Sequence, residues 1–167
     1  MAGTEATEYE RALAENRRYA AQFDRSALPG VPGRKLAVLA CMDARITVED
    51  VLAIRTGDAH IIRNAGGLAT DDALRSLIIS QQLLGTEEVI VIGHTRCGML
   101  TFKDDEVRRR LAEQTGVDFD VTFYAFQDLE SNIRAQIERI KAHPWTKDVP
   151  VHGLIYEVET GRLREVA

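Results

Sequence analysis

Cys41, His94 and Cys97 are residues of the types that bind zinc, and they occur in two places, each just after an apolar run of strand length. The chain has only two cysteines, and both belong to this set. His94 and Cys97 are three residues apart, so one turn can bring both side chains to a single point. Cys41 can join them if its strand lies beside the strand that precedes His94 in a parallel sheet. The sequence therefore predicts one zinc ion per chain, bound by these three side chains.

Asp43 and Arg45 follow Cys41 at alternate positions. In an extended chain such residues share one face, so their side chains are expected to project to the same side as the thiol. Arg45 can bind Asp43 through two parallel hydrogen bonds and hold the carboxylate beside the metal, where it would orient a zinc-bound water. Without that restraint Asp43 becomes a permanent fourth ligand of a structural zinc. Three protein ligands favour catalysis, because catalytic zinc sites keep one position open.

At these positions the chain resembles the β-class carbonic anhydrases. The order and the spacing of three motifs agree, and the resemblance runs from about residue 36 to residue 102. The motifs are Cys41-Met-Asp43-Ala-Arg45, Arg63-Asn-Ala-Gly66 and Gly93-His94-Thr-Arg-Cys97-Gly98.

The resemblance implies that Cys41, His94 and Cys97 bind zinc and that Asp43 and Arg45 form a catalytic dyad. It implies a zinc lyase that catalyses the reversible hydration of carbon dioxide to bicarbonate and a proton, through attack by a zinc-bound hydroxide that the dyad orients. In some members the aspartate moves onto the metal, so Asp43 is also expected as a fourth ligand in a closed form. The resemblance further implies a homodimer or a higher homo-oligomer.

Three features depart from the common pattern of this family. Ala44 stands where many members have serine, and Val38 stands where some have a tryptophan of a bicarbonate regulatory pocket. Residues 29–33 contain no glutamine, although many members have an upstream glutamine that helps to orient substrate. Relatives that hydrolyse carbonyl sulfide or carbon disulfide use the same zinc ligands, so this activity is the first alternative. The second is a non-catalytic zinc-stabilised protein, or a redox protein with a Cys41–Cys97 disulfide.

Ala65, Gly66 and Gly67 follow a short apolar strand pattern. The two glycines permit a positive φ or a close approach of the backbone to another group. An ordinary turn between a strand and a helix would explain them. Beside the other motifs we expect instead that these three residues form a wall of the substrate pocket.

Length and composition limit the classes of protein that fit. A chain of 167 residues predicts one zinc-binding α/β domain, 1–167, with an N-terminal helix and linker over 1–34 and the metal-site core over 35–102. A net charge of −5 argues against nucleic acid as a partner, because phosphate binding needs a basic surface. No apolar run has the length of a membrane span, and the acidic start does not read as a signal peptide. A cytoplasmic enzyme that acts on a small molecule is therefore expected.

Apolar strand patterns alternate with helical patterns along most of the chain, which predicts an α/β fold with a mostly parallel central sheet flanked by helices. The last two strands are expected to form a C-terminal antiparallel hairpin. Thr47 and Asp104 are predicted to cap two of the helices, and the aromatic segment 117–127 is expected to pack over the sheet or at a subunit interface. The predicted strands are 35–40, 60–63, 88–92, 151–158 and 163–166, and the predicted helices are 8–22, 48–54, 70–84, 104–114 and 128–142.

Overall fold

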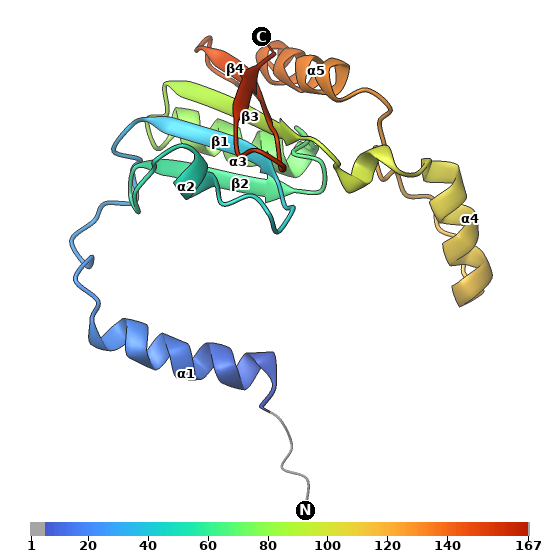
Figure 1. The fold of residues 1–167 in the computed structure, drawn as a ribbon. Helices are drawn as coiled ribbons and strands as arrows, with labels where there is room; N and C mark the ends of the chain where they lie inside the picture. Colours follow the sequence, from blue (N-terminus) through green and yellow to red (C-terminus); the bar gives the residue numbers. More distant parts are fainter. Residues whose placement is uncertain (1–5, 167) are drawn as a thin grey trace, which may run out of the picture.

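One five-stranded sheet organises the chain, and the computed structural model describes residues 6–166 (Figure 1). The strands stand in the order β2-β1-β3-β4-β5, and all neighbouring pairs are parallel except β4 and β5, which are antiparallel. The mostly parallel α/β fold and its C-terminal hairpin are therefore confirmed. The strands are β1 (Leu36–Cys41), β2 (Ala59–Asn64), β3 (Glu88–His94), β4 (Val151–Tyr156) and β5 (Leu163–Glu165).

Two helices cover one face of the sheet. Residues of α3 (Asp71–Gln82) and α5 (Leu129–Ala142) form one buried cluster with side chains of β1, β3 and β4. Helix α5 lies so close to β4 that a Cβ atom at Gly153 would stand 2.6 Å from a methyl carbon of Ile133. Every residue of β1 is buried, as expected for a strand covered on both faces.

The other face of the sheet is covered by short elements and loops. Its buried cluster includes side chains from β1, from the segment that contains α2 (Val48–Val51), and from the short 3-10 helix η1 (Gly98–Leu100). The predicted helix 48–54 is thus wrong in length. It ends after one turn because Ala53 has a left-handed backbone, with φ 49°. Thr47 occupies the predicted N-cap position, but its side chain makes no capping hydrogen bond.

Helix α1 (Glu8–Ala21) lies away from the sheet, at the end of a long linker (Figure 1). Thr7 and Glu10 form a capping box at its start. None of its residues is buried, so the helix does not cover the sheet of its own chain. The exposed apolar side chains of the helix and of the segment just after it are Tyr9, Leu13, Tyr19 and Phe23.

Helix α4 (Asp104–Thr115) is followed by a C-cap glycine, Gly116, in the left-handed conformation. Its predicted cap is wrong, because Lys103 occupies the N-cap position. The Asp104 carboxylate instead accepts hydrogen bonds from the backbone N–H groups of residues 123, 124 and 125. This carboxylate anchors part of the aromatic segment, in which Phe126 packs against the core and Phe119 is exposed.

No helix among residues 6–166 combines the length and the apolar character that crossing a lipid bilayer would require.

Candidate metal centre

The central pair of strands brings the predicted zinc ligands together. Cys41 is the last residue of β1 and His94 is the last residue of β3. These strands are parallel neighbours, so both side chains lie at the same edge of the sheet. Cys97 follows in the turn between β3 and η1. The carboxyl ends of parallel strands are the usual place for a site in this class of fold.

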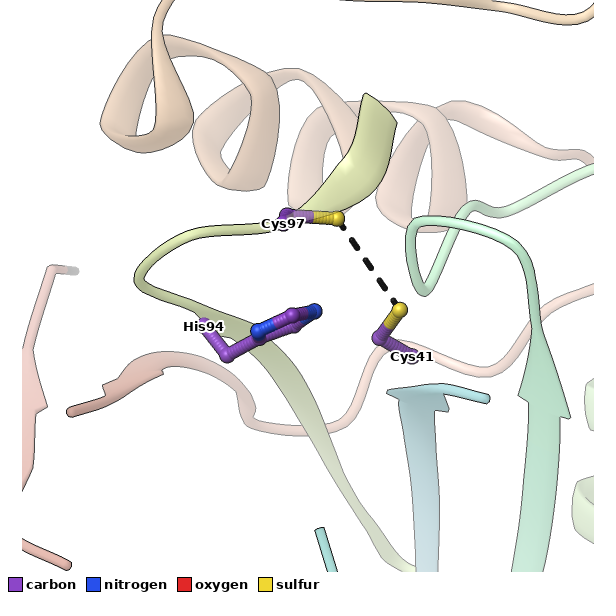
Figure 2. A group of neighbouring side chains, drawn as sticks. All are labelled: Cys41, His94 and Cys97. Carbon is purple, nitrogen blue, oxygen red and sulfur yellow. Dashed lines mark hydrogen bonds between the residues drawn. The ribbon is translucent and has the colours of Figure 1, made fainter. Parts of the chain in front are cut away.

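The three side chains converge on one point (Figure 2). Their candidate ligand atoms all lie within 4.8 Å of one another, and the two sulfur atoms are 4.0 Å apart. Two thiolates bound to one tetrahedral zinc at about 2.3 Å would stand about 3.8 Å apart. A disulfide would need about 2.05 Å, and both cysteines are free. The observed separation therefore fits a shared metal ion.

His94 is oriented toward this point by a backbone group. Its ring is fully buried, and Nδ1 lies 2.9 Å from the carbonyl oxygen of Thr95, to which it donates. The other nitrogen, Nε2, is buried without a hydrogen-bond partner in the described part of the chain. A buried polar atom without a partner is costly, and a metal ion would satisfy it. Two thiols and one imidazole are also the donor set that zinc prefers.

The two thiols face each other in a buried site and are joined by one hydrogen bond, so the ionisation of each affects the other. The hydrogen bond from the Cys97 thiol lowers the pKa of Cys41 to about 4, although burial opposes the shift. The pKa of Cys97 is raised, because its thiol donates a hydrogen bond to Cys41 and because burial disfavours the charged form. Backbone N–H groups of Asp43 and Gly66 also stabilise the Cys41 thiolate. A thiolate, which is the form that binds metal, is thus available at neutral pH.

Asp43 and Arg45 form the predicted ion pair at the rim of this site. Arg45 donates through Nε to Oδ1 at 2.9 Å and through Nη2 to Oδ2 at 2.8 Å, and its backbone N–H also donates to Oδ1. These hydrogen bonds hold the pKa of Asp43 well below its usual range. The Oδ2 atom lies 3.7 Å from His94 Nε2, so the carboxylate stands beside the imidazole nitrogen that has no hydrogen-bond partner.

Arg63 fixes the chain that carries the first ligand. It donates two hydrogen bonds to the carbonyl oxygen of Cys41, at 3.0 and 2.9 Å, and one to the carbonyl oxygen of Asp43, at 2.7 Å. Arg63 lies on β2, and its guanidinium therefore ties the neighbouring strand to the loop after β1. The second motif of the sequence thus supports the first.

The loop with Ala65, Gly66 and Gly67 lies directly beside Cys41. Gly67 has φ +65°, and a Cβ atom there would stand 2.9 Å from the Cys41 backbone nitrogen. This glycine is therefore needed for close packing. A cavity of about 300 Å³ lies nearby, and its lining includes Leu68, the residue after Gly67, and Phe126. The role of residues 65–67 as a pocket wall stays a prediction.

Comparison with known proteins places this geometry in a family. The family model described as carbonic anhydrase matches residues 36–117. A β-carbonic anhydrase 1 of Mycobacterium tuberculosis is 44% identical over 155 residues, which cover 92% of this chain and 94% of that protein. The chain belongs to the β-carbonic anhydrase family.

Two other relatives show the range of this family. The crystal structure of a carbonic anhydrase from Streptococcus mutans is 40% identical and superposes with a TM-score of 0.93, covering 98% of this chain and 100% of that one. A carbon disulfide hydrolase of Acidithiobacillus thiooxidans is 41% identical and covers 81% of this chain and 79% of that protein. The expected enzyme class, a zinc lyase of the β-carbonic anhydrase type, is confirmed at the level of the family.

Two residues that hold the segment from His94 to Cys97 in place were not predicted from the sequence. Thr95 supplies the carbonyl that orients His94, and Glu159 contacts the side chains of Thr95 and Arg96. Thr95 lies inside the third motif, so its position beside a ligand was visible. Glu159 lies 64 residues further along the chain, and only the pairing of β3 with β4 brings it near.

Proposed function

We propose that this β-carbonic anhydrase family member catalyses the reversible hydration of carbon dioxide, with a zinc ion held by Cys41, His94 and Cys97. The observation that carries the proposal is the buried, unpartnered Nε2 of His94. It faces two thiols, and a restrained carboxylate stands 3.7 Å away. Family membership supports the assignment of the reaction.

A zinc ion supplies a Lewis acid that makes water ionise more readily and polarises a bound oxygen. Asp43 would accept a hydrogen bond from a water in the site and so orient that water toward the substrate carbon. Its lowered pKa keeps the carboxylate ionised, and thus a hydrogen-bond acceptor, at neutral pH. Arg45 would act by keeping both carboxylate oxygens in place, which also restrains Asp43 from becoming a fourth ligand.

Stopped-flow measurement of carbon dioxide hydration tests this proposal. The protein is first shown to carry one zinc per chain, and the rate is measured from about pH 6.5 to about pH 9. We expect a rate that rises with pH and is lost in Asp43→Ala, with zinc retained. Arg45→Ala should also lose most activity and keep its zinc. Zinc-loaded parent protein without hydration activity at any pH in this window would overturn the proposal.

Hydrolysis of carbon disulfide or carbonyl sulfide is the second candidate. It is favoured by the relatives named as carbon disulfide hydrolases, which are about as similar to this chain as the carbonic anhydrases are. Release of sulfide from either compound by the zinc-loaded protein, with little hydration of carbon dioxide, would establish it. Measuring both reactions on the same preparation decides between the two substrates.

We also propose that the chain forms a homodimer in which α1 contacts a second copy. The helix exposes Tyr9, at 72%, and Leu13, at 44%, and it buries none of its residues against its own sheet. An isolated helix of this length is marginal in water, so a surface that covers its apolar side chains would stabilise it. A monomeric mass at micromolar concentration in light scattering would contradict this part of the proposal.

A further inference from the structure

We infer that Glu159, in the turn between β4 and β5, is a positioning residue that holds the metal loop of residues 94–97 in the geometry needed to bind zinc. The inference rests on the proposed metal site. It adds a residue from the C-terminal hairpin, which lies outside all three sequence motifs.

The loop fixes both the second ligand and the dyad through its backbone carbonyls. The Thr95 carbonyl accepts from Nδ1 of His94 at 2.9 Å and so sets the direction of the imidazole. The Arg96 carbonyl accepts from Nη2 of Arg45 at 3.2 Å. A rotation of these two peptide groups would therefore disturb a metal ligand and the Asp43–Arg45 pair together.

One residue of this loop, Arg96, has a strained backbone conformation. Arg96 has φ 54°, in the left-handed region that residues with a Cβ atom seldom adopt. Such a conformation persists only where the surrounding contacts hold it in place. The contacts that act on residues 95 and 96 therefore determine whether the loop keeps its shape.

Glu159 contacts both of these residues with its two carboxylate oxygens. Oε2 accepts from the Thr95 hydroxyl at 3.0 Å, and Oε1 pairs with Nε of Arg96 at 2.5 Å. The Thr95 hydroxyl in turn accepts from the backbone N–H of Val158 at 3.1 Å, and the Thr95 backbone N–H donates to the Tyr156 carbonyl. The hydrogen bond from Thr95 lowers the pKa of Glu159, so the carboxylate is ionised at neutral pH.

The solvent exposure of Arg96 and Glu159 favours a positioning role for this ion pair over a role in overall stability. The side chains of Arg96 and Glu159 are 71% and 43% exposed, and exposed ion pairs contribute little to folding. Groups that orient a metal ligand, in contrast, commonly change metal affinity by about 10–100-fold when they are removed. Loss of Glu159 should therefore weaken zinc binding far more than it lowers the melting temperature.

The test compares Glu159→Ala with Glu157→Ala, a control in the same turn. The Glu157 carboxylate accepts from Thr160, and among the described residues it makes no hydrogen bond to the metal loop. Zinc affinity is measured by competition with a chromogenic chelator, and Tm is measured on each metal-free variant. We expect about a tenfold loss of zinc affinity in Glu159→Ala, near-parent affinity in Glu157→Ala, and Tm values within about 4 °C of the parent.

Two further measurements show that the effect passes through the loop. In the cobalt-substituted protein, the d–d and thiolate charge-transfer bands should shift in Glu159→Ala and not in Glu157→Ala. In a Thr95→Val/Arg96→Ala background, Glu159→Ala should cause no additional loss of zinc affinity, because its partners are already gone. An additional tenfold loss there would overturn the assignment.

The outcomes distinguish a failure of this inference from a failure of the proposed zinc site. A parent protein that binds no zinc would refute the metal site itself. A parent that binds zinc, with Glu159→Ala equal to it in zinc affinity and in cobalt spectrum, would refute only the role of Glu159.

Discussion

Gly67→Ala should damage the metal site in a way that a matched glycine substitution does not. Gly67 and Gly85 both have a positive φ, +65° and +75°, so an alanine at either position is strained by about 1–2 kcal/mol. The surroundings differ. A Cβ atom at Gly85 has nothing within 4 Å, whereas at Gly67 it would meet the Cys41 nitrogen at 2.9 Å and the Ile92 oxygen at 3.0 Å. The comparison isolates the effect of contact from the effect of strain.

The atoms that crowd Gly67 belong to the backbone of β1 and β3, so they cannot move aside without moving the strands that carry Cys41 and His94. Overpacking of this kind costs about 1–3 kcal/mol. We therefore expect Gly67→Ala to lower the free energy of unfolding by about 2 kcal/mol more than Gly85→Ala does. For a chain of this length that difference is about 6 °C in Tm.

Scanning calorimetry and chelator competition measure the two consequences. Gly67→Ala should show the larger fall in Tm together with a weaker affinity for zinc, because Cys41 is displaced. Gly85→Ala should show a small fall in Tm and parent-like zinc affinity. Equal Tm values and equal zinc affinities in the two variants would refute the reasoning. The ends of β1 and β3 would then accommodate the added Cβ atom with no loss of stability.

Three further predictions concern the ligands and one anchoring carboxylate. Removing a residue that only orients a ligand reduces metal affinity by about 10–100-fold. Cys97→Ser should reduce zinc affinity by more than this range, as measured by chelator competition, and a smaller loss would argue against Cys97 as a ligand. Zinc affinity should rise by at least about tenfold per pH unit between about pH 6 and pH 8, because the protons held by the raised pKa values of Cys97 and His94 must leave before the metal binds. A pH-independent affinity would contradict this. Asp104→Ala should lower the free energy of unfolding in urea by about 1 kcal/mol at pH 7, because three N–H groups of the loop after α4 lose their acceptor. Burial would raise the pKa of Asp104, but those N–H groups outweigh it and lower the pKa, so this stabilisation is present above about pH 4 and disappears as the pH falls through the lowered value. A difference between parent and Asp104→Ala that persists at pH 2 would contradict that account.

Much of the sheet was predictable because buried parallel strands leave a simple signal. The run before Cys41 is apolar at every position, and all six residues of β1 are buried. The ends of other elements were harder to predict. The predicted helix 48–54 is only one turn long because Ala53 leaves the helical conformation. Alanine favours helices, so the residue type at this position does not predict that the helix ends. Asp104 has the composition of a cap, but its carboxylate binds the loop after α4 because that loop folds back to it.

The position of α1 also could not be predicted from the sequence. Its apolar spacing is typical of a helix with one covered face, and a capping box of Thr7 and Glu10 stabilises its start. The pattern does not say which surface covers that face, because amphipathicity is the same whether the partner is the chain's own sheet or a second copy.

By itself, the sequence determined the chemistry of the candidate site: two thiols, one imidazole, and an aspartate with an arginine two residues away, each just after an apolar run of strand length. Residue type and local spacing are sufficient for that, because ligand preference and strand alternation are local properties. The tertiary structure decided which groups hold these side chains in place. The pairing of β1 with β3 brings Cys41 within 4.0 Å of Cys97. The pairing of β3 with β4 brings Glu159 to the loop between His94 and Cys97, across 64 residues of sequence from Thr95. Such contacts depend on which strands become neighbours, and the free energy of the whole sheet, not the residues near the site, determines that arrangement.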